Sequence, residues 1–99
     1  MVIFSKEQIT KYTEQLQNAI AEQVDPENPV ELRRYLQELS AYLGLVSGIV
    51  ASARHYKDKN KSEGYLLDGA NALASDMHYR INAVQSILGY HKAEIQANF

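Results

Sequence analysis

The sequence predicts an all-α protein: a long antiparallel helical hairpin with a shorter N-terminal helix packed on it, in a three-helix bundle-like arrangement. Apolar residues recur at spacings of three and four along most of the chain, which is the period of a helix. Prolines occur only at Pro26 and Pro29, so no other proline interrupts a long helix. One charge-dense stretch, 57–64, separates two long apolar-striped segments and is typical of a turn.

The first predicted helix covers residues 6–23. Ser5 is a suitable N-cap, and Gln8 three residues later completes the pattern of a capping box. The apolar residues of this segment share one face: Ile9, Tyr12, Leu16, Ile20 and Val24. The remaining positions are polar, as expected for an amphipathic helix at the surface.

A linker at 24–28 precedes the second predicted helix, 29–57. Asn28 is a good N-cap, and Pro29 suits the first helical position. One apolar stripe comprises Leu32, Leu36, Leu39, Leu43, Val46, Val50 and Ala53, and a second row beside it comprises Tyr35, Tyr42, Ile49 and Tyr56. The two rows form a wide apolar face, which favours a core helix.

The turn is predicted at 58–64 and the third helix at 65–97. Its apolar stripe comprises Leu66, Ala70, Leu73, Met77, Ile81, Val84, Leu88, His91 and Ile95. Each of the two long helices spans about 45 Å at 1.5 Å per residue. A short turn makes two such helices antiparallel neighbours. We therefore expect residues 1–99 to form one helical domain.

Composition excludes several classes of function. Hydrophobic residues make up 45% of the chain and the net charge is −2, which indicates a globular protein without a bulk attraction to nucleic acid or to an anionic membrane. The absence of cysteine excludes disulfides, thiolate metal ligands and cysteine nucleophiles. The N-terminus lacks the pattern of a signal peptide, and we expect a cytoplasmic protein. The uncharged stretch 39–53 is shorter than the roughly 20 residues of a membrane span, so we interpret it as a buried helix of a soluble protein.

The two long helices are poor in charge. Glu38 is the only acid between Leu32 and Lys57, and Arg80 is the only lysine or arginine between Ser62 and His91. If the turn centres near residues 60–61, Glu38 and Arg80 come within about one turn of each other, and we expect them to form an ion pair across the hairpin. The alternative is that both side chains point to solvent.

Small residues follow one side of the second helix, at Ser40, Gly44, Gly48 and Ser52. A glycine inside a helix costs about 1 kcal/mol relative to alanine, so close approach of another helix would explain two of them. That helix comes either from the 6–23 segment or from a second chain.

We favour a homo-oligomer, because the 6–23 helix is too short to cover a hairpin of about 45 Å. Tyrosines suit such a contact since they combine apolar area with a hydroxyl group. The predicted interface comprises Tyr42, Gly44, Gly48, Ser52, Tyr65, Tyr79 and Tyr90.

A basic cluster at the turn gives an alternative function. Its members are Arg54, Lys57, Lys59 and Lys61, which oppose only Asp58 and Glu63 in the same stretch. In an oligomer, several such turns together could bind a phosphate backbone, with His55 and Tyr56 stacking on bases. The opposing interpretation is an ordinary solvated turn.

No pattern of catalytic or metal-binding residues is visible. The three histidines, His55, His78 and His91, do not have the spacing of a helical metal site. Carboxylates are not paired for acid–base chemistry, and there is no glycine-rich phosphate loop. We therefore expect no enzymatic activity and no cofactor.

Two stretches resemble segments of small helical proteins encoded by phages and prophages: NPVELRRYLQELSAYL at 28–43 and YRINAVQSILGYHKAE at 79–94. Many such proteins are encoded near single-strand-binding and recombinase genes and have no assigned function. The resemblance implies a viral or mobile-element origin, the host cytoplasm and an accessory role. The function we expect is an oligomeric, protein-binding accessory factor, anti-defence or recombination-associated. The alternatives are a binder of single-stranded nucleic acid that uses the basic turn, and a small-ligand sponge with pockets between protomers.

Overall fold

The protein is all-α, as predicted, over residues 2–97, which a computed structural model describes. The elements in chain order are α1 (Lys6–Ile20), α2 (Pro29–Ala41), α3 (Leu43–Lys59), a single 3-10 turn η1 (Lys61–Glu63) and α4 (Gly64–Ala97). No strand occurs within residues 2–97. The predicted stripe position Ile95 lies outside the residues whose side chains are described.

Helix α1 begins at the predicted capping box. The Ser5 hydroxyl accepts a hydrogen bond from the Gln8 N–H at 3.1 Å, and the Gln8 side chain accepts one from the Ser5 N–H at 2.9 Å. The helix ends at Ile20, three residues before the predicted end at residue 23. The Tyr35 hydroxyl donates to the Ile20 carbonyl and so satisfies one of the acceptors that the end of a helix leaves without a helical partner.

The predicted single helix 29–57 is interrupted at Tyr42. The Asn28 side chain caps α2, accepting from the Val30 N–H at 3.1 Å, and Pro29 occupies the first position as predicted. At Tyr42 the N–H donates to the carbonyl of Leu39 at 3.1 Å, three residues back, which is the tighter 3-10 pattern. Serine and glycine, here Ser40 and Gly44, are typical of such breaks.

The turn is shorter than the predicted 58–64. Helix α3 continues to Lys59, and α4 begins at Gly64. Between them the Asn60 side chain accepts from the Ser62 N–H at 3.1 Å, which satisfies one backbone donor at the start of η1.

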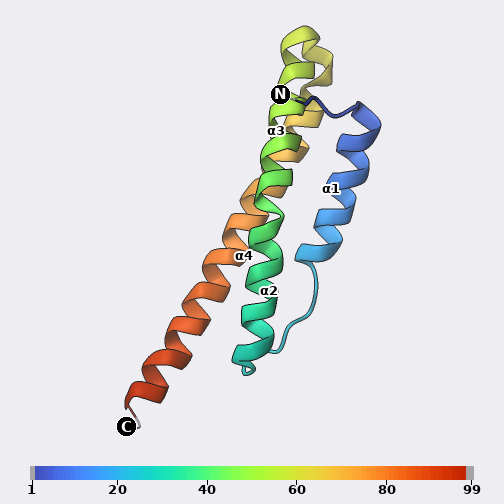
Figure 1. The fold of residues 1–99 in the computed structure, drawn as a ribbon. Helices are drawn as coiled ribbons and strands as arrows, with labels where there is room; N and C mark the ends of the chain where they lie inside the picture. The colour runs from blue at the N-terminus through green and yellow to red at the C-terminus, as the bar shows by residue number, and fades with distance from the viewer. Residues whose placement is uncertain (1, 98–99) are drawn as a thin grey trace.

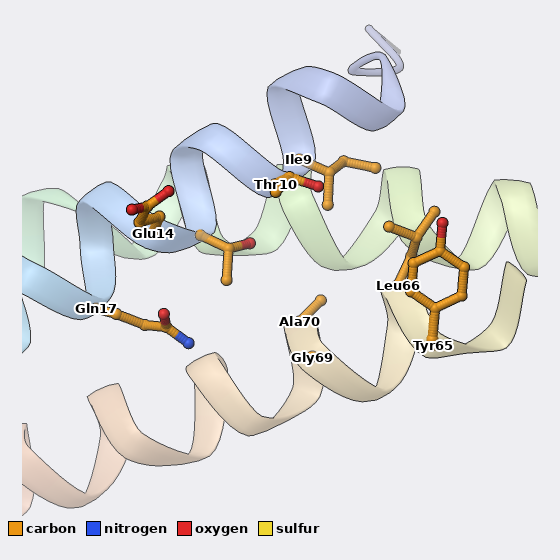
Figure 2. Close-up of a pocket in the computed structure, with 9 residues that line it drawn as sticks. Ile9, Thr10, Glu14, Gln17, Tyr65, Leu66, Gly69 and Ala70 are labelled. Carbon is orange, nitrogen blue, oxygen red and sulfur yellow. The ribbon is translucent and has the colours of Figure 1, made fainter.

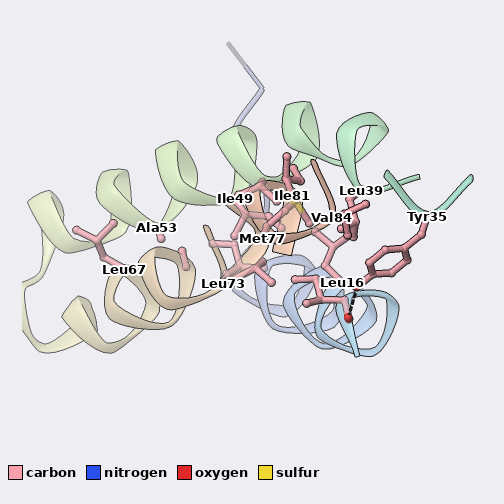
Figure 3. Packing of buried hydrophobic residues seen from close by; sticks show 14 of the residues in the cluster. Leu16, Tyr35, Leu39, Ile49, Ala53, Leu67, Leu73, Met77, Ile81 and Val84 are labelled. Atoms are coloured by element: carbon pink, nitrogen blue, oxygen red, sulfur yellow. Dashed lines mark hydrogen bonds between the residues drawn. The ribbon is translucent and has the colours of Figure 1, made fainter. Parts of the chain in front are cut away.

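Helix α4 contacts α1, α2 and α3, and α1 also contacts α3 (Figure 1). The molecule measures 59 × 21 × 18 Å, and α4 extends past the beginning of α2. The core lies between these helices, where Leu39, Ile49, Leu73 and Met77 are 0% exposed (Figure 3). Since α1 packs along one side of α3 and α4, the surface on the other side of that pair remains for solvent or a partner.

Candidate protein-binding faces

Half of the predicted small-residue row is covered by the N-terminus of the same chain. Ser52 is 0% exposed, and its hydroxyl accepts a hydrogen bond from the Phe4 N–H at 2.9 Å. A Cβ added at Gly48 would lie 3.0 Å from Cε2 of the Phe4 ring. At Gly48 and Ser52 the expected second helix is therefore replaced by Phe4.

The sequence contains only a local part of this signal. Phe4 directly precedes the N-cap Ser5, where an apolar residue often packs on the fourth residue of the same helix as a hydrophobic staple, and that rule does not reach the contacts with α3. The Tyr56 hydroxyl donates to the Phe4 carbonyl at 2.9 Å, and the Tyr12 ring meets the Phe4 ring edge-on at 5.3 Å between centroids. We call residues 2–5 the N-terminal strap, because these contacts tie them across α3.

An ion pair fixes the start of α1 beside the turn. Lys6 contacts Glu63, and the Lys6 ammonium lies 5.7 Å from the centroid of the Tyr56 ring. The hydrogen bond and the charge of Glu63 raise the pKa of Lys6 above its usual value. Lys6, which lies outside the turn, thus partly neutralises the negative charge of the Glu63 carboxylate.

Gly44, by contrast, faces open space. Within the described chain no atom outside its own helix backbone lies within 4 Å of a Cβ added there. Beside it runs a groove between α3 and α4 of about 430 Å³, which we call the open groove. It is lined by Leu43, Val46, Ser47, Val50, Ala51, Arg54, Ala74 and His78. Its floor is apolar, and Leu43, Val50 and Ala74 are only partly buried in it.

Three tyrosines project from α4. Tyr65, Tyr79 and Tyr90 are 64%, 73% and 66% exposed, which is unusual for side chains of this size. Between the first two lie the exposed small residues Gly69 and Ala72. We call this surface of α4, from Tyr65 to Tyr90, the tyrosine face.

Grooves run between the tyrosine face and α1. The larger, of about 520 Å³, has Ile9, Leu66 and Ala70 as its apolar floor (Figure 2). A second groove of about 340 Å³ contains Tyr79 and shares Gln17 with the first. A row of exposed aromatic rings beside partly apolar grooves is the kind of surface that binds another helix.

Tyr42 does not belong to this face. It lies at the break between α2 and α3, is only partly exposed and packs against the core. The predicted interface of seven residues is therefore divided in the structure. Gly48 and Ser52 lie under the strap, Gly44 lies beside the open groove, and the three exposed tyrosines lie along α4.

The predicted ion pair between Glu38 and Arg80 is wrong. Glu38 pairs instead with Arg34, one turn earlier on the same helix, at 3.1 Å, and Arg34 also contacts Glu22 at 2.7 Å. Arg80 lines a small cavity of about 140 Å³ together with Tyr35. Burial raises the pKa of the Tyr35 hydroxyl, and the nearby charge of Arg80 opposes that rise.

The basic side chains of the turn, Arg54, Lys57, Lys59 and Lys61, are all exposed. The aliphatic part of Lys57 approaches Gly64, and Arg54 lines the open groove. The described residues contain no group of three or more histidine or acidic side chains arranged to hold a metal ion.

The segment Pro29–Lys59 is long and apolar enough, by length and composition alone, to cross a membrane; its most apolar window has a mean hydropathy of 1.2. The core helix of a soluble protein has the same composition. In this segment Leu39, Ile49 and Ala53 are fully buried, while 28% of the most apolar window is buried in total.

Comparison with protein-family models, with curated proteins and with solved structures finds no match to this chain.

Proposed function

We propose that this chain is a small helical protein-binding module, which associates with itself and binds a helix of a partner protein on its tyrosine face. Its scaffold in this proposal is an antiparallel hairpin of α2 and α3 with α4, on which α1 packs. The role is that of an accessory factor rather than an enzyme, encoded by a phage or prophage and acting in the host cytoplasm.

The exposure of the three tyrosines carries the proposal. The three rings are 64–73% exposed in one row, which leaves apolar area in contact with water. A protein partner that covers this area would gain free energy by removing it from water. Gly69 leaves open space in the same row, since within the described chain nothing outside its helix lies within 4 Å of an added Cβ. A partner helix can therefore approach closely between Tyr65 and Tyr79.

The charges of this face indicate the chemistry of the partner. Asp68 and Asp76 lie four residues on either side of Ala72, and Glu14 lines the adjoining groove. Arg80 is the one lysine or arginine near them on α4. The acids outnumber the base, so we propose a partner helix that carries lysine or arginine beside its apolar anchor residues.

Site-specific photo-crosslinking in the cells that make the protein tests this assignment. With p-benzoylphenylalanine in place of Tyr65 or Tyr79, we expect one discrete adduct between the chain and another protein. The same group in place of Val30 is the matched control, because Val30 is 69% exposed but lies at the start of α2. Equal adducts at Val30, or none at either tyrosine, would contradict the proposal.

The captured partner then allows a quantitative test. The double variant Tyr65→Ser/Tyr79→Ser is expected to bind it at least about tenfold more weakly, as loss of two aromatic anchors commonly costs more than about 1.4 kcal/mol. Circular dichroism should remain unchanged because both side chains are exposed. Calorimetric titration of the purified pair gives the two affinities, and unaltered affinity would exclude the tyrosines as anchors.

Binding of single-stranded nucleic acid by the basic turn is the second candidate. One observation favours it: Glu63 is engaged by Lys6, which reduces the opposing negative charge at the turn. This function predicts affinity for a labelled oligonucleotide that falls steeply with salt, by about 0.7 log units per neutralised phosphate for each tenfold rise in salt. The triple variant Lys57→Glu/Lys59→Glu/Lys61→Glu should abolish it. Absence of binding at low salt would remove this candidate.

A further inference from the structure

We propose that the open groove between α3 and α4 binds a second copy of this chain in antiparallel orientation, with a two-fold axis near Ser47. This inference rests on the proposed function, because it assigns the self-association of that module to a specific face. It differs from the interface predicted from the sequence, because the contact between two copies no longer includes the exposed tyrosines of α4.

The surface of the groove is suited to a close helix contact. Leu43, Val50 and Ala74 leave part of their apolar area uncovered in a groove of about 430 Å³. At its outer edge Ser47 and Gly44 are exposed and small, so the axis of a second helix can come near. Burying the uncovered apolar area against an equivalent groove stabilises the pair by removing it from water.

The charges that line the groove favour an antiparallel copy. Among the described residues of the lining, Arg54 is the only lysine or arginine, and none is an acid. A parallel copy would place each Arg54 directly beside its equivalent. With the axis at Ser47, residues whose numbers add to 94 share a level, so the two Arg54 side chains are about 21 Å apart along the helices. That separation exceeds the screening length of about 8–10 Å.

The ends of the same face are complementary in the antiparallel arrangement. Asp58 of one copy comes to the level of residue 36 of the other, about one helical turn from Arg33. Arg33 and Asp58 are both exposed, and neither takes part in an ion pair with another side chain of residues 2–93. The pair would be solvated and weak, so it sets the orientation of the copies rather than their affinity.

The tyrosine face is less suited to self-association. An antiparallel copy centred on Ala72 would bring Asp68 and Asp76 of both chains into one contact, where Arg80 is the only nearby lysine or arginine on α4. Like charges in an interface suppress a pairing. The open groove has no carboxylate among its described lining residues, so two copies meet there without this repulsion.

Single cysteines give a direct test, because the natural chain contains none. Ser47→Cys places a thiol at the proposed axis, where it meets its own equivalent. Ala72→Cys places one on the tyrosine face, and Asn18→Cys places one on the exposed side of α1. Each purified full-length variant is treated with a mild oxidant or a short bismaleimide and analysed by denaturing electrophoresis. We expect Ser47→Cys to form dimers at least about tenfold faster than Asn18→Cys, since its thiols are held together before reaction.

Three outcomes would overturn the inference. Equal rates for Ser47→Cys and Asn18→Cys would mean that no copy occupies the groove. Faster dimer formation by Ala72→Cys would place the second copy on the tyrosine face. A monomer mass for the natural chain in light scattering, at all concentrations tested, would exclude self-association altogether.

A second variant separates this inference from the proposed function. Ser47→Arg is expected to leave the helical content unchanged, because Ser47 is exposed, and to convert the dimer to a monomer in light scattering. When p-benzoylphenylalanine replaces Tyr79 in this variant, the adduct with the partner protein should still form. A persistent dimer of Ser47→Arg would overturn the groove contact alone. Absence of an adduct from p-benzoylphenylalanine at position 79, in a chain that keeps Ser47, would overturn the tyrosine face alone.

Discussion

Replacing Leu39 by alanine is expected to lower the free energy of unfolding by about 2–5 kcal/mol. Leu39 is 0% exposed and belongs to the cluster where α2 meets the rest of the core. The substitution removes its apolar contacts and leaves a cavity, because helices on several sides limit how far the site can collapse. A small domain has a total stability of about 5–15 kcal/mol, so this loss is a large part of it. Urea denaturation followed by circular dichroism measures the change.

Leu36→Ala is the matched control for this experiment. Leu36 lies on the same helix, but it is only partly buried at the edge of the core. Its truncation should cost about 1 kcal/mol, since part of its area is already in water. The comparison is made at low protein concentration, where association contributes little. Equal losses for the two variants would mean that the packing around Leu39 is not as described.

Phe4 and Gly48 should show strong energetic coupling. Phe4→Ala is expected to lower the free energy of unfolding by about 2–3 kcal/mol, because its ring fills the space between α1 and α3. Gly48→Ala alone gains about 1 kcal/mol of helix propensity, but the new methyl group would sit 3.0 Å from the Phe4 ring. We expect the clash to cancel that gain or exceed it.

In the Phe4→Ala background the obstruction is absent, so Gly48→Ala should then stabilise by about 1 kcal/mol. The difference between the two backgrounds is the coupling energy, which thermal or chemical denaturation of all four proteins provides. Gly69→Ala is the control, because an added Cβ there meets nothing within 4 Å in the described chain, and its effect should be equal in both backgrounds. Additivity of Phe4 and Gly48 would show that the strap does not lie on α3.

Local rules were sufficient for the beginnings of the helices. The Ser5 capping box and the Asn28–Pro29 start depend on neighbours within a few residues, and both are present as predicted. The stripe of apolar residues also identified the core, because a 3.6-residue period brings Leu39, Ile49 and Met77 to one side of their helices.

Features that depend on distant partners were not predictable in this way. At the end of α1 the Ile20 carbonyl accepts a hydrogen bond from the hydroxyl group of Tyr35, fifteen residues away. The break at Tyr42 leaves the helical periodicity intact, so the apolar pattern does not record it. Arg34 competes for Glu38 from the same helix, and a local pair forms at a smaller entropic cost than one across the molecule.

The candidate faces were predictable only in part. The position of the exposed tyrosines on α4 follows from their spacing, and their exposure agrees with the expectation of a surface row. The role of Gly48 was not visible, because periodicity does not show which segment covers a small residue.

The N-terminal strap has a consequence for the order of folding. Its hydrogen bond from Phe4 to Ser52 joins residues 48 positions apart in the chain, so forming it closes a long loop. Closing such a loop lowers chain entropy, and the contact can compensate only when α3 already exists as a binding surface. We expect the strap to order after the helices behind it, and to be among the first parts of the protein to detach when the native state begins to open.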